Sequence, residues 1–101
     1  MRIEIVYTSQ NESINILAET KEDIFICNGR NIATPIIPFK EELLDIIFNW
    51  KSEMINSDIK DAESYKISIT TEDDFFTFIG HGIYPDNFIE FKNLILEVAN
   101  G

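Results

Sequence analysis

Residues 16–29 read ILAETKEDIFICNG, and residues 67–80 read ISITTEDDFFTFIG. With a shift of 51 positions, five of the 14 residues are identical. The identical pairs are Ile16/Ile67, Thr20/Thr71, Asp23/Asp74, Phe25/Phe76 and Gly29/Gly80. Self-similarity at a fixed offset is typical of chains built from repeated supersecondary units. Each copy has two short runs of apolar and β-branched residues around a charged turn, which predicts a β-hairpin.

A helical pattern follows each hairpin. After a proline-containing turn, the first copy continues PFKEELLDII and the second EFKNLILEVA. Apolar residues then recur at the three- and four-residue spacing of a helix with one buried face. The first stripe comprises Phe39, Leu43, Ile46, Ile47, Trp50 and Met54, and the second comprises Phe88, Phe91, Ile95 and Val98. We therefore expect two ββα-like repeats, in residues 13–56 and 65–101.

Residues 1–8 add one more strand, because Ile3, Ile5 and Tyr7 alternate with Arg2, Glu4 and Val6 and the segment is rich in β-branched residues. The predicted order is β-β-β-α-β-β-α. Short polar turns favour antiparallel pairing, so we expect an α+β fold with one antiparallel sheet of about five strands and two helices on one face. The halves should superpose with Gly29 on Gly80 and Phe39 on Phe91. The predicted core comprises Ile16, Phe25, Leu43, Ile46, Trp50, Ile67, Phe76, Phe91 and Ile95.

Composition narrows the class of protein. A chain of 101 residues, 45% hydrophobic, is expected to form a single domain over residues 1–101. Its net charge of −10 should repel nucleic acid and anionic membranes and attract basic proteins. There is one cysteine, no signal-like apolar segment near the N-terminus and no long apolar run. These features predict a cytoplasmic protein without a membrane segment.

The turns of the two hairpins are acidic. One carries Glu72, Asp73 and Asp74, and the other carries Glu19, Glu22 and Asp23. Neither has the alternating oxygen ligands and central glycine of a calcium loop, so no metal site is predicted. They are either solvated hairpin tips or the contact surface for a basic protein. Phe75 follows the second turn and joins the candidate contact if it points away from the helices.

The candidates for catalysis are few. His81 lies between Gly80 and Gly82, and Cys27 lies in an apolar strand. A metal site needs more ligands than one histidine, and a reactive cysteine needs an exposed, electropositive setting. We therefore interpret His81 as a loop residue and Cys27 as a buried thiol. No catalytic residue, metal or cofactor is predicted, and the chain is not expected to be an enzyme.

The sequence favours a binding function. Frequent isoleucine and asparagine indicate an AT-rich genome, such as that of a bacterium or a phage. A small acidic protein from such a source suits a stoichiometric inhibitor of a basic, nucleic-acid-binding protein, in the manner of an immunity protein or a phage anti-defence protein. The alternative is a homo-oligomeric module, such as a homodimer, or a small-ligand-binding module that uses the crevice between the repeats.

Overall fold

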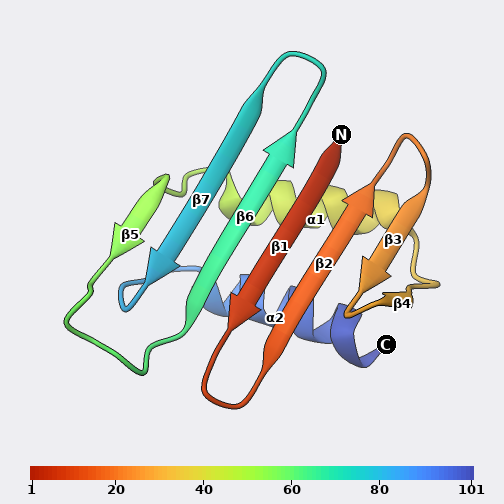
Figure 1. The fold of residues 1–101 in the computed structure, drawn as a ribbon. Coiled ribbons are helices and arrows are strands. Elements are labelled where there is room, and N and C mark those ends of the chain that lie inside the picture. Colours follow the sequence, from red (N-terminus) through yellow and green to blue (C-terminus); the bar gives the residue numbers. More distant parts are fainter.

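The computed structural model describes residues 1–101 and shows one seven-stranded sheet with both helices on one face (Figure 1). The order across the sheet is β4-β3-β2-β1-β6-β7-β5. The strands are β1 (Arg2–Thr8), β2 (Ser13–Glu19), β3 (Ile24–Cys27), β4 (Arg30–Asn31), β5 (Glu53–Ile55), β6 (Ser64–Thr70) and β7 (Phe75–His81). The helices are α1 (Ile36–Ile47) and α2 (Phe88–Asn100). The α+β class with two helices on one face is confirmed.

The N-terminal strand lies at the centre of the sheet. β1 pairs antiparallel with β2 on one side and with β6 on the other. Its residues Ile3, Ile5 and Tyr7 alternate with exposed ones and are almost fully buried. Successive side chains of a strand point to opposite faces, so this alternation directs one face towards the helices and leaves the other open.

The helices close the core from one side. Phe39 and Leu43 of α1, and Phe91 and Ile95 of α2, are buried against the inward face of the sheet. Four aromatic rings meet between α2 and the sheet, with centroid separations from 5.2 to 6.3 Å. They belong to Trp50, Tyr65, Phe88 and Phe91. The prediction that Trp50 is a core residue is confirmed.

The sheet has two more strands than expected, and it is mixed. β4 adds two residues beside β3, and β5 adds three residues parallel to β7. Met54, which fits the helical stripe, lies in β5 because α1 ends at Ile47. A distant side chain contributes to this end, since Asn87 donates from Nδ2 to the Ile46 carbonyl at 2.7 Å. No local pattern in the sequence shows that contact.

The two hairpins cannot be superposed, which corrects the prediction that the halves match. β2 and β6 both run antiparallel to β1, so they point the same way, and both direct the same face to the helices. However, β3 lies on one side of β2, whereas β7 lies on the opposite side of β6 (Figure 1). A rotation that preserves strand direction and buried face therefore cannot place β7 on β3. The similar sequences encode similar inward-facing patterns, not superposable units.

The burial of Phe76 was predicted wrongly. The other predicted core residues are buried, but the side chain of Phe76 is 49% exposed. Phe76 pairs with Ile69 and faces the helix side of the sheet. The start of β7 and the turn before it extend beyond α1, as Figure 1 shows. No helix therefore covers this end of the inward face.

Candidate functional site

The two acidic turns lie at the same end of the sheet. The β2–β3 turn (residues 20–23) follows β2, and the β6–β7 turn (residues 71–74) follows β6. Arg2, at the start of β1, pairs with Glu19 on one side and Thr70 on the other. The turns therefore flank the N-terminal end of β1, with two strands, β1 and β6, between β2 and β7 (Figure 1).

The β6–β7 turn presents three unpaired carboxylates. Glu72, Asp73 and Asp74 are exposed, and none of them takes part in an ion pair. Thr71 holds the turn closed, because its backbone N–H donates to the Asp74 carbonyl at 2.9 Å and its Oγ1 accepts from the Asp74 N–H at 3.0 Å. These hydrogen bonds hold the backbone of the turn, and its three carboxylates form no ion pair within the molecule.

The β2–β3 turn is less available. Glu19 lies 4.0 Å from the N-terminal ammonium group and accepts a hydrogen bond from the Lys21 N–H at 3.0 Å. Lys21 places a positive charge within the turn itself, beside Glu22 and Asp23. Of the six predicted acidic residues, the three of the β6–β7 turn therefore form the stronger candidate for binding a basic partner.

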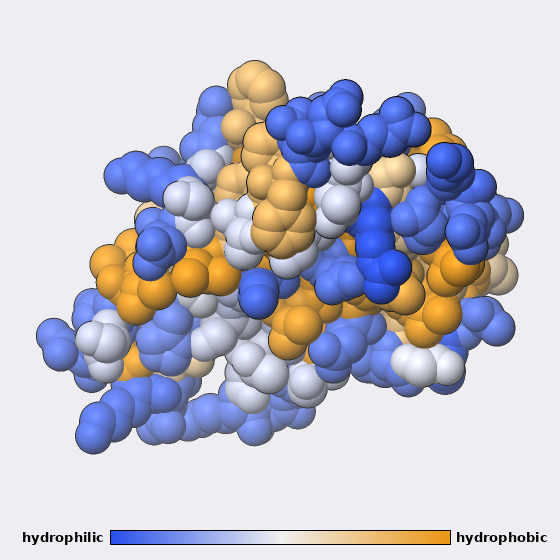
Figure 2. Space-filling model, turned by 45° about the horizontal axis from the view of Figure 1, so that its top comes forward, coloured by the Kyte–Doolittle hydropathy of each residue, from blue (hydrophilic) through white to orange (hydrophobic).

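Two exposed phenylalanines adjoin the β6–β7 turn. Phe75 is 65% exposed and faces away from the helices, and Phe76 faces the helix side. Figure 2, in which this end of the sheet is turned forward, shows hydrophobic side chains at the surface among hydrophilic ones. Aromatic residues are enriched at the core of protein interfaces, and the rim around that core is polar. We use the name "β7 tip" for Glu72, Asp73, Asp74, Phe75 and Phe76.

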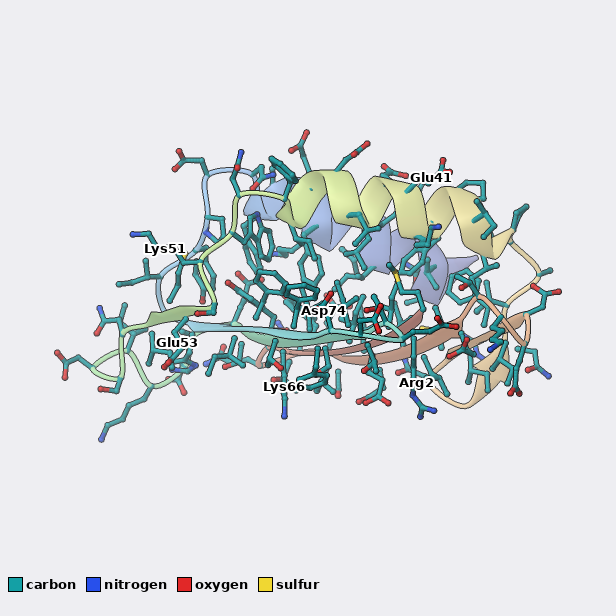
Figure 3. All side chains as sticks on the ribbon, turned by 90° about the horizontal axis from the view of Figure 1, so that it is seen from above. Arg2, Glu41, Lys51, Glu53, Lys66 and Asp74 are labelled. Atoms are coloured by element: carbon teal, nitrogen blue, oxygen red, sulfur yellow. The ribbon has the colours of Figure 1, made fainter.

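The open face of the sheet has a different character. Arg2 and Lys66 point away from the helices on this face, while Glu41 lies on the helix side (Figure 3). Arg2 donates from Nε to Glu4 at 2.7 Å, so these two charges are paired. Arg2 and Lys66 thus place positive charge on the open face, where the charge of Arg2 is paired with Glu4.

A second acidic surface was not predicted from the sequence. A groove of about 410 Å³ between α1 and α2 is lined by four carboxylates, from Glu42, Asp45, Glu90 and Glu97. Within each helix these residues are spaced by three or seven positions, which places them on one side. That spacing is visible in the sequence, but only the antiparallel packing of the helices brings the two pairs together. We call this surface the inter-helix groove.

His81 and Cys27 do not form a catalytic pair. His81 is the last residue of β7 and not the loop residue that was predicted, and three strands separate β7 from β3, which carries Cys27. Both nitrogens of His81 are engaged, with Nδ1 2.5 Å from the Ser64 hydroxyl and Nε2 2.6 Å from the Ile59 carbonyl. Because a carbonyl only accepts, Nε2 carries a proton. His81 fastens the segment before β6 to the end of β7, and Cys27 is fully buried, with its pKa raised by burial.

Glycine at position 82 is required by the backbone conformation and by the space around it. Its φ of +80° is unfavourable for other residues, and a Cβ there would lie 2.7 Å from the Asn56 carbonyl oxygen. Gly80 has another role, because a Cβ there would overlap the buried ring of Tyr65. The glycines around His81 thus serve packing and backbone geometry.

Glu63 joins three parts of the fold. Its Oε1 lies 2.5 Å from the Tyr7 hydroxyl on β1 and 2.5 Å from Lys92 Nζ on α2. Burial raises the pKa of Glu63, but the hydrogen bonds from Lys92 and Tyr7 outweigh it and the net shift is downward. Burial and the same carboxylate raise the pKa of Tyr7. All three groups are engaged with one another, which makes this a structural link.

The Glu63 link predicts a dependence of stability on pH. A carboxyl whose pKa is lowered by folding stabilises the protein above its unfolded pKa of about 4.3, and this contribution is lost as the pH falls through the folded pKa. Between pH 6 and pH 3, the free energy of unfolding should therefore fall less steeply in Glu63→Gln than in the parent protein. Urea titrations across that range measure this, with Glu41→Gln as an exposed control. Equal slopes in all three proteins would contradict the role of Glu63.

No group of three or more His, Cys, Asp or Glu side chains is arranged to hold a metal ion. Neither helix is long and apolar enough to cross a membrane. Comparison with known protein families, with characterised proteins and with solved structures finds no match.

Proposed function

We propose that the protein is a stoichiometric inhibitor that binds a basic, nucleic-acid-binding protein through the β7 tip. One observation carries the proposal: three exposed carboxylates without ion pairs, Glu72, Asp73 and Asp74, directly precede two exposed phenylalanines on a projecting end of the sheet. The charges and the apolar anchor that a contact needs are thus joined in one short segment.

The carboxylates and the phenylalanines of the β7 tip would contribute to binding in different ways. Free carboxylates attract a basic surface over a distance of about 10 Å at moderate salt and so raise the rate of encounter. Aromatic side chains buried on contact provide most of the binding free energy at many interfaces. The unfavourable exposure of Phe75 and Phe76 in the free protein is relieved when a partner covers them.

The net charge of the protein indicates the class of partner that it would bind. A protein that binds nucleic acid presents a basic cleft to phosphates, and a molecule with a net charge of −10 competes for that cleft without a catalytic group. Nuclease toxins and nucleic-acid-binding defence proteins have this character. We therefore propose that the present chain acts in the cytoplasm as an immunity protein or as a phage anti-defence protein.

Charge neutralisation at the β7 tip tests the proposal. The variant Glu72→Gln, Asp73→Asn, Asp74→Asn should bind a captured basic partner with an on-rate about tenfold lower at low salt, and with a weaker salt dependence. Stability should change by less than about 0.5 kcal/mol, because the three side chains are exposed and unpaired. Surface plasmon resonance at several salt concentrations measures the on-rates.

The inter-helix groove provides a matched control. Glu42→Gln, Asp45→Asn, Glu90→Gln changes the net charge by the same three units at a different surface. Its on-rate should fall only about twofold, through the weaker overall field. Equal loss in both variants would remove the β7 tip from the contact, and a larger loss in the control would assign the contact to the inter-helix groove.

The alternative function is a homo-oligomeric or small-ligand-binding module. One observation favours a ligand: a groove of about 420 Å³ lies between the end of α1 and the start of α2, lined in part by Phe48, Lys51 and Tyr84. Its lining residues come from both segments that were predicted to be repeats, 13–56 and 65–101, although those segments do not superpose. Analytical ultracentrifugation tests the oligomer, and thermal shifts with a metabolite library test the ligand. A dimer, or a ligand shift abolished by Lys51→Ala, would favour this alternative.

A further inference from the structure

The outer edge of β7 is only partly covered. On its inner side β7 pairs with β6 along its whole length, from Phe75 to His81. On its outer side β5 pairs only with the last three residues, Ile79–His81. The first four residues of β7, 75–78, therefore form a free edge next to the three carboxylates of the β6–β7 turn.

The existing hydrogen bonds show which backbone groups point outward. The Ile79 N–H donates to the Ser52 carbonyl at 2.9 Å, and the His81 carbonyl accepts from the Asn56 N–H at 2.7 Å. Backbone groups in a strand alternate in direction, so Phe75 and Thr77 also direct their N–H and C=O outward. Nothing in the fold pairs with these donors and acceptors along the uncovered part of the strand.

The opposite edge of the sheet is protected. β4 pairs with Ile26 and Cys27 of β3, and the Ile32 N–H donates to the Phe25 carbonyl at 2.8 Å. The chain itself thus covers most of that edge. Proteins usually cover or blunt their free edges, because an uncovered edge pairs with other chains. The start of β7 is instead left open beside two exposed phenylalanines.

We propose that the β7 edge binds an extended segment of the basic partner, which adds as a further strand beside residues 75–78. This inference deepens the proposed function, on which it rests. Added strands take their affinity from backbone hydrogen bonds and their selectivity from alternating side chains. The acidic turn selects lysine or arginine at one end of the segment, and Phe75 and Phe76 take apolar side chains on the two faces.

Charge argues against a second copy as the occupant. Two antiparallel β7 edges, paired along residues 75–78, would bring the β6–β7 turn of each copy against the start of β5 in the other, where Glu53 and Lys51 are both exposed and offset one another. However, each copy carries a net charge of −10. Like charges oppose this pairing, whereas a basic segment meets the same carboxylates with attraction.

A proline at position 77 tests the edge directly. Thr77→Pro removes an N–H that points outward, and it leaves the hydrogen bonds to β6 intact, so an edge strand tolerates it. Thr77→Val is the matched control, because it retains the N–H. Affinity for the captured basic protein should fall about tenfold or more in Thr77→Pro and less than about threefold in Thr77→Val. Circular dichroism and melting curves establish that both variants are folded.

Amide exchange gives a second readout with a defined probe. The probe is a synthetic peptide of two arginines followed by alternating valine and threonine. In the free protein, NMR should show faster hydrogen exchange at the Phe75 and Thr77 amides than at the Phe76 and Phe78 amides, which bond to β6. Saturating peptide should protect Phe75 and Thr77, and a peptide with glutamates in place of the arginines should bind about tenfold more weakly.

The outcomes separate this inference from the proposed function. Peptide binding without protection of Phe75 and Thr77, or no binding at millimolar peptide, would overturn the inference. Protection that rises with protein concentration alone would assign the edge to a second copy and also overturn it. A captured partner whose affinity is unchanged in Thr77→Pro would retain the inhibitor function and remove the edge. Protection by the peptide, with no basic protein captured, would support the edge and count against the inhibitor.

Discussion

Phe91→Ala should lower the free energy of unfolding by about 3–5 kcal/mol. The ring of Phe91 is fully buried, and it packs on Trp50, Tyr65 and Phe88 between α2 and the sheet. Its removal loses the transfer free energy of the ring and leaves a cavity that rigid neighbours cannot fill. Because small domains have about 5–15 kcal/mol in total, the variant should be close to its limit of stability.

Urea unfolding followed by tryptophan fluorescence measures this loss, since Trp50 reports on the same cluster. Phe48→Ala is the matched control, because Phe48 at the end of α1 is 82% exposed and should cost less than about 0.5 kcal/mol. Equal losses in the two variants would contradict the packing of α2 on the sheet.

Phe25→Ala and Phe76→Ala should differ by about 2–4 kcal/mol, although the two residues are equivalent in the duplicated sequence. Phe25 is 5% exposed, and its ring lies 4.9 Å from that of Phe39 on α1. The ring of Phe76, beyond the reach of the helices, loses only part of its contact with water on folding. We expect a cost of about 3–5 kcal/mol at Phe25 and about 1 kcal/mol at Phe76.

Thermal unfolding by calorimetry distinguishes the two cases. A two-fold relation between the halves would instead make the two costs equal, as the sequence alone suggests. Similar melting temperatures for the two variants would therefore contradict the difference in burial between Phe25 and Phe76.

The local parts of the fold follow from the sequence. Alternation placed Ile3, Ile16 and Ile67 on the buried face, and the helical spacing identified Leu43 and Ile95 as core residues. These patterns depend on residues that are close in sequence, so the local structure that they predict is found in the fold almost unchanged. They also yielded the α+β class and the position of both helices on one face.

The order of the strands in the sheet could not be predicted from the sequence. The side of β6 on which β7 lies depends on which side is already taken by β1, and the alternation of Phe76 and Phe78 is the same in either case. The strand β5 is not predicted because Met54 fits a helical stripe equally well, and the end of α1 is bonded by the distant Asn87. Long-range packing decides both features.

The candidate site was predictable in part. The acidic residues and Phe75 of the β7 tip are contiguous in the chain, and a charged turn between strands is exposed in almost any fold. The inter-helix groove and the link of Glu63 to Tyr7 and Lys92 join residues far apart in sequence. The free edge of β7 depends on where β5 begins, because Glu53 pairs with Ile79 and leaves residues 75–78 uncovered, so no sequence pattern indicates it.

An inhibition titration tests whether the chain blocks nucleic-acid binding by a basic partner. The captured basic protein is held at a concentration well above its dissociation constant for the present chain, and its binding to labelled nucleic acid is followed as the chain is added. We predict a linear loss of nucleic-acid binding that ends at one molecule per partner, and incomplete inhibition at that ratio by Glu72→Gln, Asp73→Asn, Asp74→Asn. Undiminished nucleic-acid binding at excess inhibitor, or equal inhibition by that variant, would contradict the account.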